Sequence, residues 1–219
     1  MSATSALRVL VGGTFNPIHF GHLRSALELA EALNAPQVHL LPCHIPPHRV
    51  QPSVPSSLRL KLIELAIADE PRLAVDAREL EHERYSYSLH TLKAVREEIG
   101  AESPLIFALG MDAFLGIESW HQWQDLFQLA HFVVFTRPGA KPQHMSAHLK
   151  AFFEAHRSDD SAPLINTPCG RIWMFPVTAL DISSTRIRQL IAAGNSPRYL
   201  LPGAVWDYIQ MNRLYLERE

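Results

Sequence analysis

Short apolar runs alternate with longer amphipathic stretches along this chain. Each apolar run has the length of a buried strand and is followed by glycine, proline or polar residues, which end strands. The pattern predicts strands at residues 7–11, 38–41, 73–75, 105–109, 131–135 and 172–175. Between them, apolar residues recur at spacings of three and four, as on one face of a helix. Helices are therefore expected near residues 21–33, 58–68, 88–99, 124–129, 145–156, 184–193 and 203–215.

The alternation of strands and helices predicts the fold class. Short, wholly apolar strands separated by helices are typical of a parallel sheet that is buried on both faces. We therefore expect an α/β, Rossmann-like fold of three layers, with a mostly parallel central sheet flanked by helices on both faces. No repeat or linker divides the chain, so residues 1–219 are expected to form a single domain. Ligands bind such sheets beyond the carboxyl ends of the strands, where the strand order reverses.

Composition narrows the classes of function. A chain of 219 residues that is 47% hydrophobic and 19% charged can bury a core and is not disordered. The 20 basic and 22 acidic side chains give a net charge of −2, which indicates no nucleic-acid or membrane surface. Two cysteines exclude a disulfide framework, and neither a membrane-spanning run nor a signal peptide is visible. A cytoplasmic protein is expected, and the 12 histidines raise the question of metal or phosphate chemistry.

The segment at residues 12–22, GGTFNPIHFGH, follows the first predicted strand. Gly12 and Gly13 would let a ligand approach backbone N–H groups without a Cβ atom in the way. His19 and His22 would lie on one side of the next helix's first turn, where N–H groups and the helix dipole favour an anion. Two imidazoles there can donate to a phosphate. The alternatives are a glycine-rich turn with incidental histidines, or metal ligation, for which no third ligand stands at zinc spacing.

A second segment, ISSTRIR at residues 182–188, is typical of a helix start. Ser183 or Ser184 is a natural N-cap. Arg188 can offer a guanidinium fork to the same phosphates, whereas Arg186 is expected to be exposed. Such a helix start is common, so alone it is weak evidence for a phosphate site. The chain contains neither a G-x-G-x-x-G dinucleotide motif nor a P-loop.

Together the two segments resemble a known family. GGTFNPIHFGH resembles the G-x-F-D-P-x-H-x-G-H signature of a nucleotidyltransferase superfamily. ISSTRIR resembles the closing signature of its nicotinate mononucleotide adenylyltransferases of bacterial type. Weaker segments fit that family in its order: PPHR (46–49), SYS followed by TL (86–92), GMD followed by WH (110–121), and RPG (137–139). The match thus runs from residue 12 to residue 188.

The resemblance implies an enzyme of NAD biosynthesis. Such an enzyme joins nicotinate mononucleotide to the AMP part of ATP and releases pyrophosphate, with Mg²⁺ carried mainly by ATP. The resemblance implies His19, His22 and Arg188 as catalytic residues, and no metal ligands in the protein. The residues implied for ATP binding are Gly12, Gly13, Thr14, Phe15, Gly110, Asp112, Arg137, Ile182, Ser183, Ser184 and Thr185. Those implied for mononucleotide binding are His48, Arg49, Ser88, Trp120 and His121.

Two details bear on how far the resemblance reaches. Asn16 stands where the family signature has Asp, which keeps a small polar residue at the turn but removes a charge. No catalytic role is therefore assigned to it. Apart from Glu118, no acidic residue stands beside Ser88 or His121. This predicts a pocket of donors around the pyridine carboxylate, and a preference for nicotinate over nicotinamide mononucleotide.

Several alternatives stay open at this stage. Other nucleotidyltransferases of the superfamily share the histidine motif, although pantetheine-phosphate enzymes tend to be shorter and lack ISSTRIR with the Trp120 segment. Class I aminoacyl-tRNA synthetases have a related motif, but this chain lacks a K-M-S-K-S run. A catalytically silent nucleotide-binding module is disfavoured by the intact histidines, and a metal-binding regulator rests on the histidine count alone. The expected partners are the two substrates, without nucleic acid or membrane, and homo-oligomerisation is left open.

Overall fold

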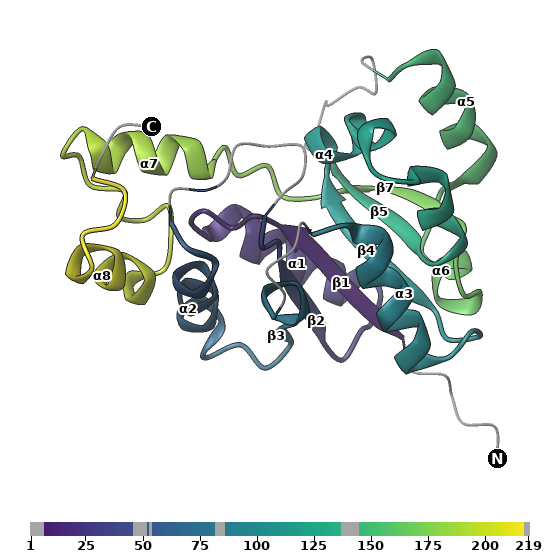
Figure 1. Cartoon of the computed structure of the whole chain (residues 1–219), viewed down its shortest axis with the longest axis horizontal. Coiled ribbons are helices and arrows are strands. Elements are labelled where there is room, and N and C mark those ends of the chain that lie inside the picture. Colours follow the sequence, from purple (N-terminus) through teal and green to yellow (C-terminus); the bar gives the residue numbers. More distant parts are fainter. Residues whose placement is uncertain (1–6, 46–51, 53, 82–85, 137–144, 217–219) are drawn as a thin grey trace.

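Seven parallel strands form the sheet at the centre of the described residues. The computed structural model describes residues 7–45, 52, 54–81, 86–136 and 145–216 (Figure 1). The strand order is β3-β2-β1-β4-β5-β7-β6, and each neighbouring pair is parallel. The strands are β1 (Arg8–Gly13), β2 (Val38–Pro42), β3 (Leu73–Val75), β4 (Leu105–Gly110), β5 (His131–Thr136), β6 (Arg157–Ser158) and β7 (Ile172–Pro176). The predicted α/β class and the parallel sheet are confirmed.

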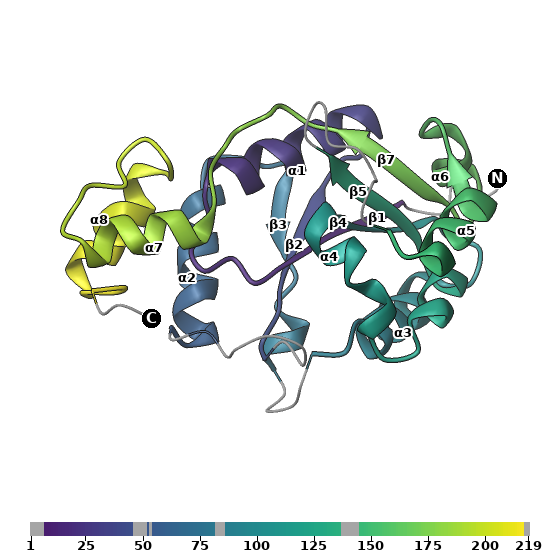
Figure 2. The same cartoon turned by 90° about the horizontal axis from the view of Figure 1, so that it is seen from above.

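Helices cover both faces of this sheet, as Figure 2 shows from above. They are α1 (Phe20–Ala32), α2 (Ser56–Ile67), α3 (Ser88–Ile99), α4 (Met111–Leu115), α5 (Ala147–His156), α6 (Ala162–Asn166), α7 (Ser184–Ala192) and α8 (Gly203–Met211). Three 3₁₀ turns join them: η1 (Arg78–Leu80), η2 (Ile117–Ser119) and η3 (Trp123–Gln128). None of the described helices is long and apolar enough to cross a membrane.

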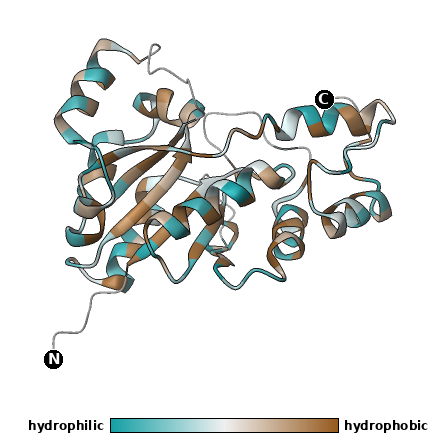
Figure 3. Cartoon of the chain, turned by 180° about the vertical axis from the view of Figure 1, so that it is seen from behind, coloured by the Kyte–Doolittle hydropathy of each residue, from teal (hydrophilic) through white to brown (hydrophobic). Residues whose placement is uncertain are grey.

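The two faces of the sheet hold two separate apolar cores. Along β1, Val9 and Val11 belong to one core while Leu10 belongs to the other, because successive side chains of a strand point to opposite faces. The first core packs under α1, α2, α7 and α8, and the second packs under α3, α4 and α5. Figure 3 shows the strands as mostly hydrophobic ribbons between helices of mixed hydropathy. The continuous apolar runs of the sequence therefore match strands that are buried on both sides.

The differences from the predicted elements are small and have local causes. The strand β6 and the helices α4 and α6 were not predicted, because elements of two and five residues show no period. The predicted helix at 124–129 is the 3₁₀ turn η3. The predicted helix at 203–215 is too long. It ends at Met211, because Arg213 and Tyr215 adopt left-handed backbone conformations with φ of 51° and 63°.

The arrangement of β1 between β2 and β4 determines where a ligand can bind. The chain proceeds from β1 to β2 and β3 on one side of the sheet, then returns to β4 on the other side of β1. The strand order therefore reverses at β1, and a crevice opens beyond the carboxyl ends of β1 and β4. The loops that follow β1, β2 and β4 border this crevice. On the other side of β2, α7 and α8 lie beside α2 in Figure 1, away from α3 and α5.

Candidate active site

Aromatic rings pack against the two glycines at the end of β1. A Cβ atom at Gly12 would lie 2.7 Å from the ring of Phe107, and one at Gly13 would lie 2.8 Å from the ring of Phe15. Side-chain atoms do not approach so closely, so both positions need glycine for the packing of the strand. The sequence suggested ligand approach as the reason for these glycines, and the structure adds a second reason. Phe15 is only 2% exposed, so its side chain belongs to the apolar core.

The two histidines of the loop stack on each other at the start of α1. The ring centroids of His19 and His22 lie 3.7 Å apart, with an angle of 23° between the planes. The backbone N–H of His19 donates a hydrogen bond to Nδ1 of His22 at 3.3 Å. A Cβ atom at Gly21 would lie 3.0 Å from the His19 ring, so the glycine between the histidines makes room for that imidazole. The predicted position of both rings on one side of the first turn agrees with this geometry.

His22 is a neutral donor in this environment. Burial lowers the pKa of His22 well below its usual range, and the adjacent His19 lowers it further. Because Nδ1 accepts the N–H of His19, the proton of the neutral ring is assigned to Nε2. His22 therefore presents one N–H group and no net charge. The ring of Phe15 meets it edge-on, with centroids 5.1 Å apart, which holds the imidazole in place.

The start of α7 is fastened to the same loop. Ser184 Oγ donates to the carbonyl oxygen of Pro17 at 2.8 Å, and Arg188 Nη1 donates to the carbonyl oxygen of Asn16 at 2.9 Å. Ser183 is the N-cap of α7, since its Oγ accepts the N–H of Arg186 at 3.2 Å. The bonds of Ser184 and Arg188 span 167 and 172 positions of the chain, so they join the two sequence motifs in space. We call residues 12–22 and 182–188 together the histidine corner.

Asn16 has a structural role within the histidine corner. Its Oδ1 accepts a hydrogen bond from the Tyr215 hydroxyl at 2.8 Å, and both side chains are buried. Its backbone carbonyl accepts from Arg188. The neutral amide thus provides the acceptor that Tyr215 needs without placing a charge in a buried position. This contact explains how the turn tolerates Asn where the family signature has Asp.

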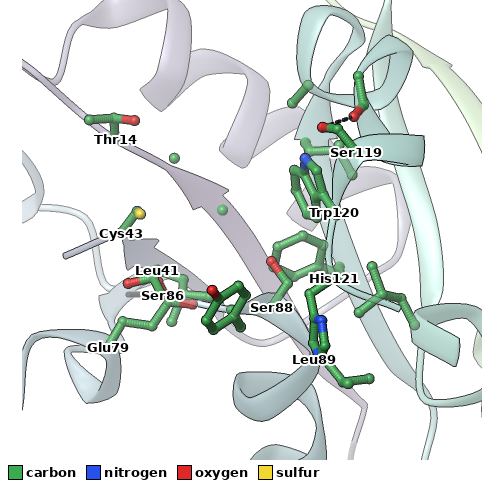
Figure 4. A pocket seen from close by; sticks show the side chains of 18 of the residues that line it. Thr14, Leu41, Cys43, Glu79, Ser86, Ser88, Leu89, Ser119, Trp120 and His121 are labelled. Atoms are coloured by element: carbon green, nitrogen blue, oxygen red, sulfur yellow. Dashed lines mark hydrogen bonds between the residues drawn. The ribbon is translucent and has the colours of Figure 1, made fainter. Parts of the chain in front are cut away.

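A cavity of about 270 Å³ opens next to the histidine corner, beyond the ends of β1, β2 and β4. Three of the residues implied for mononucleotide binding, Ser88, Trp120 and His121, line it together. Four of the residues implied for ATP binding also line it: Gly12, Gly13, Thr14 and Asp112. Figure 4 shows Trp120 and His121 on one side of the cavity, with Thr14 and Cys43 on the other. The structure thus brings members of both sets to a single opening.

The remaining implied residues lie elsewhere or outside the described part. Gly110 is exposed at the end of β4, and Ile182 is half-buried just before α7. His48, Arg49 and Arg137 fall outside the described residues. The described cavity is not lined by His19, His22, Arg188 or the start of α7. The histidine corner therefore borders the described cavity through Gly12, Gly13 and Thr14.

Glu79 is a cavity residue that the sequence did not reveal. It lies in η1, lines the cavity, and accepts a hydrogen bond from Thr91 Oγ1 at 2.7 Å. Burial raises the pKa of its carboxyl group, while hydrogen bonds from Thr91 and Ser86 act in the opposite direction. Ser86 Oγ in turn accepts the N–H of His44 at 2.9 Å. Glu79 comes shortly after the end of β3, just as other site residues come after the ends of their strands. This position in the sequence is the signal that could have identified Glu79 as a site residue.

The acidic groups near the cavity refine the prediction of a pocket made only of donors. In Figure 4, Glu79 lies with Leu41 and Ser86, across the cavity from Trp120. Glu118 does not line the described cavity, and its carboxylate accepts from Ser146 at 2.6 Å and contacts His148 at 3.1 Å. The cavity lining therefore contains two acidic side chains, Asp112 of α4 and Glu79 of η1, of which Glu79 lies away from the Trp120 side.

The many histidines do not gather into a metal centre in the described residues. No group of three or more His, Cys, Asp or Glu side chains there is placed to hold a metal ion. His131 illustrates a structural use of the side chain, since it is fully buried. Its Nε2 contacts the carbonyl oxygen of Thr167 at 2.8 Å, and its Nδ1 accepts the N–H of Arg171 at 3.0 Å. Burial lowers the pKa of His131, so this ring is a neutral link between β5 and β7.

Known proteins resemble this chain both in sequence and in fold. The family model described as cytidylyltransferase-like matches residues 10–190. The structure of Plasmodium falciparum nicotinic acid mononucleotide adenylyltransferase complexed with NaAD aligns with a TM-score of 0.74 at 16% identity. That alignment covers 97% of this chain and 98% of the other, and shows a common fold. The fold and the matching family model define a nucleotidyltransferase of the cytidylyltransferase-like class.

The curated relatives are more specific. The "Probable nicotinate-nucleotide adenylyltransferase" of Aeromonas salmonicida is 44% identical over 94% of this chain and 95% of its own length. The protein of the same name from Cellvibrio japonicus is 45% identical over 94% of this chain and 97% of its own length. The chain belongs to the nicotinate-nucleotide adenylyltransferase family.

Proposed function

We propose that this protein transfers the adenylyl group of ATP to nicotinate mononucleotide. A phosphate oxygen of the mononucleotide attacks the α-phosphorus of ATP, the bond to the β-phosphate breaks, and pyrophosphate leaves. The product is nicotinate adenine dinucleotide. The attacking phosphate is already anionic near neutral pH, so catalysis consists mainly of positioning and of stabilising charge on the transferred group. The convergence of the histidine corner with a cavity lined by Trp120 supports this proposal most directly.

The histidine corner is proposed to bind the triphosphate of ATP. His22 would donate its Nε2 proton to the oxygens of the α-phosphate, and His19 would assist it. Arg188 and the start of α7 would hold the leaving phosphates, because a helix N-terminus and a guanidinium both favour anions. The hydrogen bonds of Ser184 and Arg188 to the loop after β1 support this assignment, since they keep both halves of the corner together.

The cavity is proposed to bind the mononucleotide. Trp120 would cover a face of the pyridine ring, and backbone N–H groups near Ser88 and His121 would hold its carboxylate. The position of Ser88 as the first residue of α3 supports this, because the N–H group at the first position of a helix has no acceptor within that helix. Gly12, Gly13 and Thr14 of the histidine corner line the same cavity. The reacting phosphates of the two substrates would therefore meet at these residues.

Mg²⁺ is proposed to arrive with ATP. The described residues provide no cluster of three ligands, so the phosphate oxygens would supply most of its coordination. The ion would neutralise charge on the triphosphate. The described residues would contribute the histidine and arginine groups that donate to the triphosphate.

A substrate panel tests the proposed function. Purified protein is incubated with Mg-ATP and, separately, nicotinate mononucleotide, nicotinamide mononucleotide and phosphopantetheine, and pyrophosphate release is measured. The nicotinate compound should be used best, with kcat/KM roughly tenfold to a hundredfold above that of the amide, whose NH₂ group would face donors. Faster turnover of phosphopantetheine would reject the assignment. Equal use of both mononucleotides would reject only the proposed acid selectivity.

A further inference from the structure

A buried arginine stands behind the loops that border the cavity. Arg59 of α2 is only 1% exposed. Its Nη1 donates to the carbonyl oxygen of Thr14 at 2.6 Å, and its Nη2 donates to the carbonyl oxygen of His44 at 2.9 Å. These carbonyl groups belong to the loops after β1 and β2. One guanidinium group therefore holds together two loops that are 30 residues apart in sequence.

The positive charge of Arg59 has no negative partner among the described residues. Other arginines among the described residues, such as Arg24, Arg72 and Arg78, pair with carboxylates. Arg59 forms no such pair, and its Nε is buried without a hydrogen-bond partner. Burial lowers the pKa of Arg59, but a guanidinium remains protonated at neutral pH. A buried cation that meets only neutral acceptors is costly, and a nearby anion offsets that cost.

The position of Arg59 relative to the cavity indicates which anion would offset its charge. Thr14 lines the cavity, as does Cys43, the residue just before His44. Figure 4 shows Thr14 and Cys43 on the side opposite Trp120. A mononucleotide whose pyridine ring lies against Trp120 places its phosphate at the other end. That end is the side of the cavity formed by Thr14 and Cys43, which Arg59 supports from behind.

We propose that Arg59 is a positioning residue for the phosphate of the mononucleotide. This inference rests on the proposed function and adds a residue to it. The guanidinium fixes the spacing of the loops after β1 and β2 by binding one carbonyl oxygen from each. It turns these carbonyl oxygens toward itself, and its unbalanced charge stabilises a phosphate held between the loops. Arg59 does not contact the substrate and acts through the loops and through its charge.

Arg96 provides a control, because it is a half-buried arginine that makes the same kind of contact with backbone carbonyl groups at a distance from the cavity. Arg96 of α3 also donates to backbone carbonyl oxygens, among them those of Leu129 at 2.5 Å and Pro168 at 2.9 Å. It does not line the described cavity, and it supports the opposite end of α3 from Ser88. A role of Arg59 in stability alone would make the two arginines equivalent. A role in phosphate binding makes them different.

The test compares a ligand with and without the phosphate. Wild type, Arg59→Lys, Arg59→Met and Arg96→Lys are each titrated by calorimetry with nicotinate mononucleotide and with nicotinate riboside. Arg59→Lys keeps the charge but cannot bridge both carbonyl groups. We expect its affinity for the mononucleotide to fall roughly tenfold, and that of Arg59→Met to fall further, because the charge is also lost. Affinity for the riboside should stay within about twofold of wild type, and KM for ATP should change less than KM for the mononucleotide.

Arg96→Lys should lower the melting temperature while leaving mononucleotide affinity unchanged. The proposal is overturned if Arg59→Lys binds the mononucleotide like wild type, if it loses riboside affinity equally, or if Arg96→Lys shows the same loss. If Arg59→Met does not fold, the lysine variant still decides the question. Absence of dinucleotide formation by the wild type would reject the proposed function instead, because the binding comparison needs no turnover.

Discussion

The histidine corner and the part of the cavity lining formed by Glu79, Ser86 and Trp120, called the wall below, are built in different ways. In the corner, Ser184 and Arg188 hold backbone carbonyl groups of the loop after β1, so the main chain itself is fixed. In the wall, hydrogen bonds between side chains join Glu79 to Thr91 and Ser86, and only the Ser86 Oγ reaches the main chain, where it accepts the N–H of His44. Bonds to the backbone preserve a geometry, whereas contacts between side chains can be changed one at a time. We therefore expect variants of the corner to affect the chemical step and variants of the wall to affect substrate selection.

The largest expected effect tests the corner. Replacing His22 with Ala removes a donor to the transferred phosphate and should lower kcat by on the order of 10²–10³. Stability should fall by about 1–2 kcal/mol, because the N–H of His19 loses its acceptor. Steady-state kinetics and thermal melting check both values, with His148→Ala as a control on an exposed histidine of α5. A folded His22→Ala enzyme with wild-type kcat would contradict the assignment.

A smaller effect is expected at the wall. Replacing Trp120 with Ala removes an aromatic surface of the cavity, and KM for nicotinate mononucleotide should rise roughly tenfold. KM for ATP should change little, since the histidine corner is intact. Varying each substrate in turn separates the two constants, and Trp206→Phe on α8 serves as the control. A larger effect on ATP than on the mononucleotide would show that the two regions have been assigned the wrong way round.

The smallest effect concerns the pH dependence of stability at Glu79. Its pKa is raised in the folded protein, so the folded state binds its proton more tightly than the unfolded state. This contribution is fully favourable below the unfolded pKa and is lost as pH rises through the folded pKa. The side chain of Glu79→Gln does not titrate, so the variant does not lose stability in this way as the pH rises. The unfolding free energy of the variant relative to wild type should therefore increase from acidic to neutral pH, as urea unfolding at several pH values can measure. A constant difference would contradict the raised pKa.

Much of the fold was predictable because its signals are local. The strand predicted at residues 7–11 and the helix after it each show their own pattern, and the parallel pairing follows from the alternation of strands and helices. Elements such as β6 and α4 were missed because they are too short to show a period. The packing of Phe107 against Gly12 was not predictable either, since it joins β4 to β1 across the sheet.

The same distinction applies to the candidate site. His19 and His22 lie within one helical turn, so their spacing alone predicts that they meet. Arg59 looks like any polar residue of an amphipathic helix, and its burial depends on loops that fold over it. Glu79 likewise gains significance only from Thr91 and Ser86. Residues whose role comes from burial by distant segments are therefore invisible in a single sequence.

The contact between Tyr215 and Asn16 joins residues 199 positions apart in the chain. Ribosomes synthesise the loop that contains Asn16 early, while Tyr215, Ser184 and Arg188 are made late. Throughout most of translation the loop therefore exists without the groups that fix it. We expect a chain interrupted before residue 215 to carry both histidines and yet lack a fully assembled corner. Premature termination would then yield fragments that keep the motif but not a fully organised site, which couples catalytic competence to nearly complete synthesis.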